Sequence, residues 1–432
     1  MNLNQIKNLA IKFGSPFFLL SEKKIEKNIE TFRNCFEEYK GKFTLGYSTK
    51  TNPSIGILQI MKKNNVISEC ASYLDLASSI KAGYLGDDVV YAGLHKPIES
   101  LEYSIEKKIK IINIESLFEA KNIYEILKKK NMKIKVGIRI AFPAKSGIKS
   151  ILGVTYDRFG ASTQSGEAKR IADFLVDKKD FFDLHGVHCH PGSNIKSSKN
   201  YKIAIDELVK LSDYIKQKHN IKIKLFNIGG GVGITQVHFY SLFDLMFNTL
   251  SRIFKKRLQY DIKSFDQKKM LQEIVIYLNK KFQLKNEFPE IMMEPGRALI
   301  GNAIDLKAKV VNIKKTNSGK WLIIDAGTNL LPILTLFTEY RSITSLNENP
   351  SVSKYSIAGP LLYSSDVIAT NVKLPEQQIG DFINIGDVGA YFNSQSSHFL
   401  FARCATVLEE RDGNFKAIER KEEFADIITR SS

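Results

Sequence analysis

The sequence has few of the features that mark specialised classes of protein. Cysteine is scarce, and the four thiols, Cys35, Cys70, Cys189 and Cys404, are scattered with neither disulfide-framework nor metal-ligand spacing. The N-terminal residues lack the long apolar core of a signal peptide. No apolar run approaches the roughly 18 residues that a membrane span needs. These absences predict a protein of the reducing cytoplasm, with no membrane partner and no metal site.

A basic excess is present, with a formal net charge of +17. The lysines are spread through helical stretches such as residues 128–130 and 255–257, and no basic block is interleaved with aromatic residues. Solvated helix faces explain this distribution better than a nucleic-acid interface does. We therefore expect no nucleic-acid partner, while attraction to an anionic substrate or an acidic protein stays open.

The order of apolar runs predicts an α/β fold built on a barrel. A length of 432 residues exceeds one ordinary core, so two domains are expected. Helical stretches of crossover length lie between most of the strand-like runs, and eight alternating β and α units are typical of a (β/α)8 TIM barrel. The eight runs are residues 43–50, 66–72, 88–94, 110–115, 133–140, 182–190, 222–228 and 290–293.

A second, mainly β domain is expected after Arg297, where short β-type runs are separated by Gly, Asn, Ser and Pro. These runs are residues 303–313, 320–326, 366–370, 382–388 and 400–407. The N-terminal run at 17–20 has no other sheet to join. We therefore predict a barrel domain over 35–298, with a helical insertion at about 233–289, and a β domain formed by 1–34 and 299–432.

Polar residues stand at the C-terminal ends of the predicted barrel strands, where a barrel places its active site. They include Lys50, Arg139, His188-Cys-His-Pro-Gly-Ser193, Gly229-Gly-Gly-Val-Gly233 and Glu294-Pro-Gly-Arg297. Taken singly, Lys50 is interpreted as a solvated flank, His190 as a core histidine and Arg297 as a surface ion pair. Together they predict an anion-binding site in which bare glycine amides and an arginine fork approach a phosphate.

These motifs, with Gly389-Ala-Tyr391, resemble those of the fold-type III pyridoxal-phosphate enzymes. The most similar group is the diaminopimelate and ornithine decarboxylases, with their siderophore-pathway and secondary-metabolite relatives. The resemblance runs from about Phe17 to Phe401 with the motifs in order. It implies a C-terminal β domain like that of alanine racemase, and a head-to-tail homodimer with shared active sites.

The resemblance also implies a role for each motif residue. Lys50 would form the Schiff base with pyridoxal phosphate, His190 would stack on its ring, and Glu294 would face the ring nitrogen and keep it protonated. Arg139 would lie near the phenolic side. The phosphate would be held by Ser193, Gly229, Gly230, Gly231, Gly296, Arg297 and, from the β domain, Tyr391.

Two departures from the family pattern affect the expected substrate. Similar enzymes carry a cysteine followed by an acidic residue where this chain has Leu362-Tyr363. They also carry an arginine and a tyrosine where an ungapped placement gives Ile333 and Phe337. We therefore expect a non-standard amino-acid-type substrate, either free or carrier-bound, with Tyr363 or water as the proton donor to Cα. Two alternatives stay open, an amino-acid racemase and a non-catalytic binding protein that keeps the fold.

Overall fold

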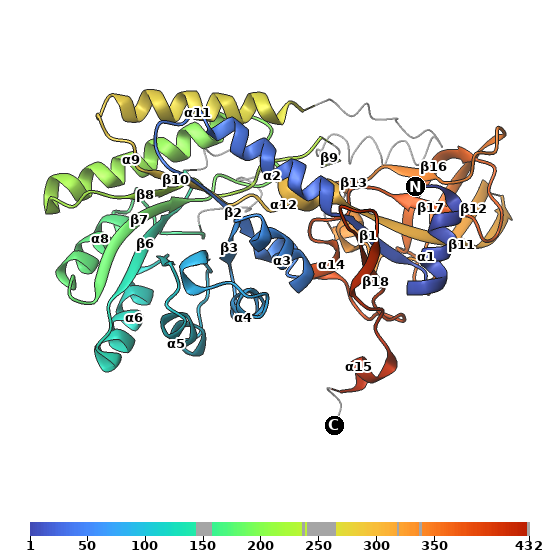
Figure 1. Cartoon of the computed structure of the whole chain (residues 1–432), viewed down its shortest axis with the longest axis horizontal. Helices are drawn as coiled ribbons and strands as arrows, with labels where there is room; N and C mark the ends of the chain where they lie inside the picture. The colour runs from blue at the N-terminus through green and yellow to red at the C-terminus, as the bar shows by residue number, and fades with distance from the viewer. Residues whose placement is uncertain (144–157, 236–237, 240–264, 318, 337–338, 430–432) are drawn as a thin grey trace. The chain divides into compact units, whose positions relative to one another are not determined.

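In a computed structural model the described residues are 1–143, 158–235, 238–239, 265–317, 319–336 and 339–429. They belong to two compact units (Figure 1). One unit, here called the barrel unit, comprises Asn28–Gly233 and Asp266–Ala298. The other, here called the β unit, comprises Met1–Lys27, Ile234–Phe265 and Leu299–Ser432. No helix among the described residues is long and apolar enough to cross a membrane.

The barrel unit is built on a closed parallel barrel, which confirms the predicted (β/α)8 fold class. Its strands are buried almost throughout, because each is a short run of apolar and β-branched residues between polar turns. The strands in order around the barrel are β10 (Glu290–Met293), β2 (Phe43–Ser48), β3 (Ile67–Cys70), β4 (Val89–Tyr91), β5 (Ile111–Ile114), β6 (Ile134–Ile140), β7 (Phe182–Cys189) and β8 (Leu225–Asn227).

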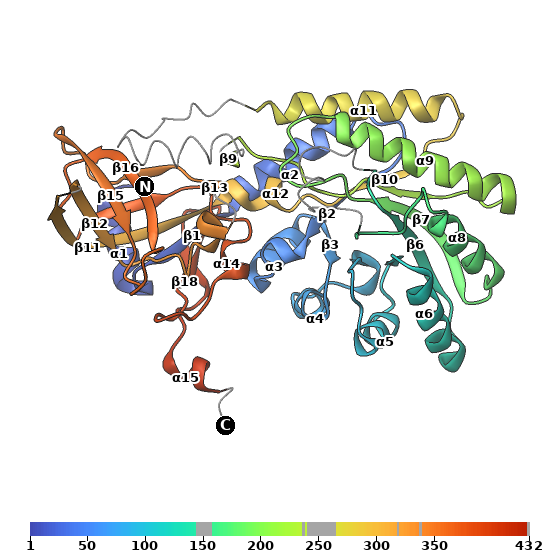
Figure 2. The same cartoon turned by 180° about the vertical axis from the view of Figure 1, so that it is seen from behind.

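Helices with one apolar face connect the strands and surround the barrel (Figures 1 and 2). Ser72 and Ser116 begin two of them, because each hydroxyl accepts a hydrogen bond from a backbone N–H of the first turn. The described helices are α2 (Glu22–Phe36), which begins in the β unit, α3 (Ile55–Lys63), α4 (Tyr73–Lys81), α5 (Ile98–Glu106), α6 (Leu117–Lys130), α8 (Glu167–Asp177), α9 (Lys199–His219) and α11 (Gln267–Gln283).

The expected insertion at about 233–289 differs from the observed arrangement. Helix α11 belongs to the barrel unit, where it lies beside α9 in both views (Figures 1 and 2). Its apolar face, which includes Leu271, Ile274 and Leu278, is buried. The helix therefore serves as the connection before β10. Most of the rest of the expected insertion, residues 236–237 and 240–264, lies outside the described residues.

The β unit contains a nine-stranded sheet, as expected for the second domain. Strand β1 lies between β11 and β18, so the prediction that the N-terminal run joins this sheet is confirmed. Three strands of this sheet, β14, β15 and β19, fall outside the predicted runs. The strands are β1 (Phe17–Ser21), β11 (Ile304–Thr316), β12 (Gly319–Ile324), β14 (Ile343–Ser345), β15 (Val352–Ala358), β16 (Val367–Pro375), β17 (Phe382–Ile385), β18 (Ala405–Glu409) and β19 (Phe415–Glu419).

Short elements complete the β unit. Helix α1 (Leu3–Phe13) packs Ile6 and Leu9 against the apolar face of the sheet. Strand β9 (His238–Phe239) pairs with β13 (Glu339–Tyr340). The remaining helical turns are α12 (Arg297–Ile300), which begins in the barrel unit, α13 (Pro332–Leu336), α14 (Phe392–Gln395) and α15 (Phe424–Ile428).

Candidate active site

Lys50 lies directly after β2, in a single 3-10 turn over Thr49–Thr51, and its side chain is exposed. The backbone on either side is fixed, since Thr49 and Thr51 are fully buried. The Thr49 hydroxyl bonds the Ser68 hydroxyl at 2.7 Å, and Ser48 donates to Glu69 Oε2 at 2.7 Å. A strand end fixed by buried neighbours therefore presents an exposed amine at the C-terminal face of the barrel.

Three polar residues form a row across adjacent strands at this end of the barrel. Arg139 pairs with His188 in the β6–β7 register, and His188 pairs with Asn227 in the β7–β8 register. Glu294 follows β10, the next strand, and its Oε1 accepts a hydrogen bond from Asn227 Nδ2 at 2.5 Å. Asn227 Oδ1 also accepts from the Gly229 N–H at 2.9 Å. Asn227 thus ties the carboxyl of Glu294 to the glycine loop.

The surroundings of Glu294 disfavour the ionised form of its carboxyl group. It is 3% exposed, and burial together with the nearby Glu69 carboxylate raises its pKa to about 8. The Asn227 hydrogen bond, Arg139 and Lys50 act in the opposite direction. In the protein alone Glu294 therefore keeps a proton at neutral pH. A cation placed beside it would stabilise the carboxylate form.

His190 is held as a neutral ring. Its Nδ1 accepts a hydrogen bond from the Gly230 N–H at 3.4 Å, so the ring proton belongs on Nε2. Burial, Lys50 and Arg139 lower its pKa to about 3. Lys50 is thus close enough to act on both His190 and Glu294. A neutral imidazole of fixed orientation is suited to packing against a flat aromatic ligand.

The glycine loop after β8 is bound to the loops that follow β7 and β10. The Ile195 N–H donates to Gly231 O at 2.7 Å, the backbone N–H of Glu294 donates to Gly229 O at 3.0 Å, and the buried Tyr201 hydroxyl donates to Gly230 O at 2.6 Å. A Cβ on Gly231 would lie 1.9 Å from Gly192 O, and its φ is +88°. Only glycine therefore fits there.

The same loops carry the other predicted phosphate ligands of the barrel unit. Gly296 lies against Thr51, whose Oγ1 would be 1.9 Å from an added Cβ. Arg297 is 7% exposed and begins α12, while Ser193 is exposed on the loop after β7. Bare backbone, one hydroxyl and a buried guanidinium thus come from three adjacent loops. This donor set fits a phosphate.

Arg139 is held by Glu115, which the sequence did not assign to the site. Arg139 Nη1 lies 2.6 Å from Glu115 Oε1, and Glu115 Oε2 accepts from the Gly160 N–H at 3.1 Å. Glu115 therefore anchors the arginine and does not cap the following helix, a role that Ser116 fills. Glu69 and Asn227 were missed in the same way, while His188 was named in its motif but given no role. An inward-facing polar residue in a short buried strand is the signal that could have found them.

The other residues that the sequence singles out, Tyr363, Tyr391 and Ile333, lie in the β unit. The Tyr363 hydroxyl bonds Thr328 Oγ1, its ring packs edge-on against Phe399 with centroids 5.5 Å apart, and the neighbouring Leu362 is 91% exposed. Tyr391 has a φ of 72° and precedes α14. The roles of Tyr363 and Tyr391 stay predictions. For the substrate carboxylate positions, Ile333 is buried, and Phe337 lies outside the described residues.

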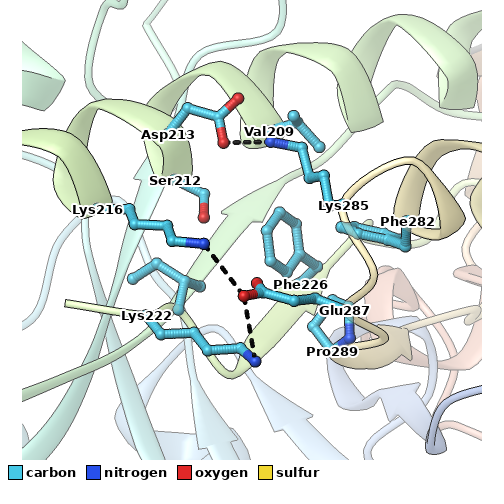
Figure 3. A pocket seen from close by; sticks show the side chains of 11 residues that line it. Val209, Ser212, Asp213, Lys216, Lys222, Phe226, Phe282, Lys285, Glu287 and Pro289 are labelled. Carbon is cyan, nitrogen blue, oxygen red and sulfur yellow. Dashed lines mark hydrogen bonds and ion pairs between the residues drawn. The ribbon is translucent and has the colours of Figure 1, made fainter. Parts of the chain in front are cut away.

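Other candidate groups do not belong to this site. Cys189 lies between His188 and His190, but burial raises the pKa of its thiol to about 12, so it is no nucleophile at neutral pH. A pocket of about 150 Å³ lies at the opposite end of the barrel, beside the starts of β8 and β10 (Figure 3). Ion pairs offset part of the positive charge at its rim, with Glu287 Oε1 lying 3.1 Å from Lys216 Nζ and 3.5 Å from Lys222 Nζ.

The fold and the phosphate-type donor set together point to a class of protein, the barrel enzymes that bind pyridoxal phosphate. The chain matches the family described as pyridoxal-dependent decarboxylase, pyridoxal binding domain, over residues 22–301. It therefore belongs to the pyridoxal-dependent decarboxylases, and it is a pyridoxal-phosphate-dependent carboxy-lyase that acts on an amino acid.

Curated relatives resemble the chain over nearly its whole length. Diaminopimelate decarboxylase of Methanocaldococcus jannaschii is 29% identical over 431 residues, covering 98% of this chain and 92% of the relative. The Aquifex aeolicus enzyme of the same name is 27% identical over 427 residues, covering 98% of this chain and 93% of the relative. A crystal structure of the M. jannaschii enzyme in complex with L-lysine has a TM-score of 0.87 at 27% identity, covering 98% of this chain and 94% of that one.

Proposed function

We propose that this enzyme decarboxylates an amino-acid-derived substrate other than diaminopimelate, releasing carbon dioxide and an amine. The observation that carries the proposal is Leu362-Tyr363, where similar enzymes have a cysteine and an acid. An exposed leucine can neither donate a proton nor bind a distal ammonium group. The names of the curated relatives favour a second candidate, diaminopimelate itself. A direct comparison of substrates decides between the two.

In the proposed site, each residue of the barrel unit has one task. Lys50 holds the cofactor covalently, His190 covers its ring, and Glu294 faces its nitrogen as a carboxylate. Arg139, fixed by Glu115, lies on the phenolic side. The phosphate is held by Ser193, Gly229, Gly230, Gly231, Gly296 and Arg297, with Tyr391. Bound pyridoxal phosphate supplies the electron sink that lets the bond to the leaving carboxylate break.

The proton that replaces carbon dioxide at Cα needs a donor. We assign this role to the Tyr363 hydroxyl, supported by its hydrogen bond to Thr328 and by the partial exposure of its side chain. Asp366 supports the loop by accepting from the Thr328 N–H at 2.8 Å and the Leu361 N–H at 2.7 Å. Both bonds would keep the phenol in place.

The proposal includes a head-to-tail homodimer in the cytoplasm. Two sets of exposed apolar side chains support the dimer, because large exposed apolar groups commonly mark interfaces. The barrel set is Tyr73, Leu74, Leu94, Ile98 and Phe118, and the β set is Leu362, Tyr363, Phe399, Leu400 and Phe401. Each set on one subunit would cover the other set on its partner. Four free, buried thiols suit a reducing compartment.

Absorbance spectra and carbon dioxide release test the function. The purified protein should show the absorbance of lysine-bound pyridoxal phosphate, and Lys50→Ala should lose it. A panel of amino acids, including diaminopimelate, ornithine, lysine and carrier-linked derivatives, should give carbon dioxide fastest from a substrate other than diaminopimelate. Fastest release from diaminopimelate would establish the second candidate. Racemisation without release would favour a racemase, and no turnover of any candidate would favour a binding protein.

A further inference from the structure

His188 is a buried histidine of the row across β6, β7 and β8, to which neither the sequence nor the proposed function gives a task. Its side chain is 2% exposed. Neither ring nitrogen has a hydrogen-bond partner among the residues that the structure describes. Its Nε2 lies 3.5 Å from Glu294 Oε2. A buried imidazole without a partner is costly, and the carboxyl group of Glu294 is the nearby group that could serve as its partner.

The geometry around Glu294 leaves one carboxyl oxygen for His188. Oε1 is occupied by the Asn227 amide at 2.5 Å. Oε2 faces the imidazole from the adjacent side. Because Asn227 and His188 are register partners on β8 and β7, they approach the same carboxyl group from neighbouring strands. A small rotation of the carboxyl group would bring Oε2 within hydrogen-bond distance of Nε2.

The surrounding charges decide which partner carries the proton. Burial, Arg139, His190, Lys50 and Lys96 all lower the pKa of His188, so an imidazolium is disfavoured. Burial and Glu69 raise the pKa of Glu294, so its carboxyl group keeps its proton at neutral pH in the protein alone. A neutral acid therefore faces a neutral imidazole, which can accept its hydrogen.

We propose that His188 is a positioning residue for Glu294, whose carboxyl O–H donates to His188 Nε2 in the cofactor-free protein. The proton stays on Oε2, and the ring proton of His188 lies on Nδ1. With Asn227 on Oε1, both oxygens of the acid are then fixed before the cofactor arrives. The inference rests on the proposed role of Glu294 at the ring nitrogen. An imidazole suits this place, because it can accept from an acid or, in its other tautomer, donate to a carboxylate.

Infrared spectroscopy of the full-length, cofactor-free protein tests the hydrogen bond. At about pH 6 the protonated carboxyl of Glu294 should give a C=O band, identified by its loss in Glu294→Gln. In His188→Phe, which cannot accept the hydrogen bond, this band should move to higher wavenumber. His188→Asn should bring it back towards the wild-type position through its amide oxygen. The matched control is His185→Phe on the same strand, which should leave the band unchanged.

Nitrogen-15 NMR of the wild-type protein gives a second readout that does not depend on whether a variant folds. His188 should be in the Nδ1–H tautomer. A His188 found in the Nε2–H tautomer, or a Glu294 band at the same position in wild type and His188→Phe, would overturn the inference. The infrared and NMR measurements are made without substrate and without bound cofactor. A failure of carbon dioxide release would therefore count against the proposed function alone.

Discussion

At the scale of single residues, the site is governed by where protons are held. Two carboxyl groups, Glu69 and Glu294, are buried together, and each is hydrogen-bonded to a neighbour, Ser48 or Asn227. Like charges at short range in a dry site cannot both ionise easily. Lys50 and Arg139 also act on neutral His190, whose pKa they help to lower. Changes at any of these positions should therefore alter the pH behaviour of the others.

Glu294 should make the cofactor-free protein less stable as pH rises. Its folded pKa of about 8 exceeds the unfolded value of 4.5, so between these values the unfolded chain binds fewer protons than the folded protein does. Stability is then lost as pH rises through this window. Relative to Glu294→Gln, the wild type should lose a few kcal/mol, on the order of 1.4 per unit of pKa difference, between about pH 5 and 8.

Denaturant unfolding of both cofactor-free proteins at several pH values measures this loss. The control is Glu290→Gln on the same strand, since hydrogen bonds from Thr44 and Lys42 help to lower the pKa of Glu290. The difference in the free energy of unfolding between Glu290→Gln and the wild type should stay constant over the same pH range. A constant difference between wild type and Glu294→Gln would contradict the assigned protonation.

At the scale of elements, the site depends on three loops that touch one another through backbone atoms. The strand ends were predictable from the sequence, because apolar, β-branched runs are bounded by polar and glycine-containing turns. The pairs Glu115–Arg139 and Asn227–Glu294 could not be predicted, because each pair joins residues from different strands and depends on the register of the barrel. Strand β15 was missed because Val352–Ala358 has mostly polar or exposed residues. Of the run predicted at 400–407, only the part that begins at Ala405 forms a strand.

Gly231→Ala should abolish cofactor binding and lower stability. The added Cβ would lie 1.9 Å from Gly192 O, and the loop would have to open to accept it. We expect a loss of at least about 2 kcal/mol in stability, with no cofactor absorbance. The control is Gly413→Ala, where φ is +87° but nothing lies within 4 Å. It should cost only the strain of about 1 kcal/mol and retain full cofactor occupancy. Equal behaviour of both variants would contradict a crowded loop.

Phe282→Ala should destabilise the barrel unit without changing the chemistry of the site. Phe282 is 2% exposed near the end of α11 and packs edge-on against Phe226, with ring centroids 5.1 Å apart. Removing the ring leaves a cavity, so we expect a loss of about 3–5 kcal/mol in thermal or denaturant unfolding. Leu284→Ala, two residues later and 81% exposed, should change stability by less than about 0.5 kcal/mol. A small effect at Phe282 would mean that α11 does not stabilise the barrel.

At the scale of the whole molecule, the proposed homodimer would share its active sites between two subunits. Tyr363 lies in the β unit, while Lys50 lies in the barrel unit. If the β set of one subunit covers the barrel set of its partner, the proton donor comes from the second chain. Activity should then depend on protein concentration in the range where the dimer dissociates.

Phe399→Glu should weaken the homodimer and activity together. Phe399 is 51% exposed and contacts Tyr363, so a buried charge at the interface would be strongly disfavoured. Sedimentation should show monomers at concentrations where the wild type is dimeric, and carbon dioxide release should fall at least about tenfold. Ile379→Glu, also in the β unit and 68% exposed, should leave both unchanged. A fully active monomeric Phe399→Glu protein would exclude the shared site.

The position of β1 has a consequence for how the chain folds during synthesis. Phe17 pairs with Lys307 on one side and with Ala405 on the other, so β1 must wait for two strands that are made much later. All eight barrel strands leave the ribosome between these events. We therefore expect the barrel unit to fold first, with residues 17–21 unpaired until β11 has been made and paired along only one edge until β18 follows. A nascent chain stopped just before residue 304 should expose this apolar strand to chaperones, although all eight strands of its barrel have been made.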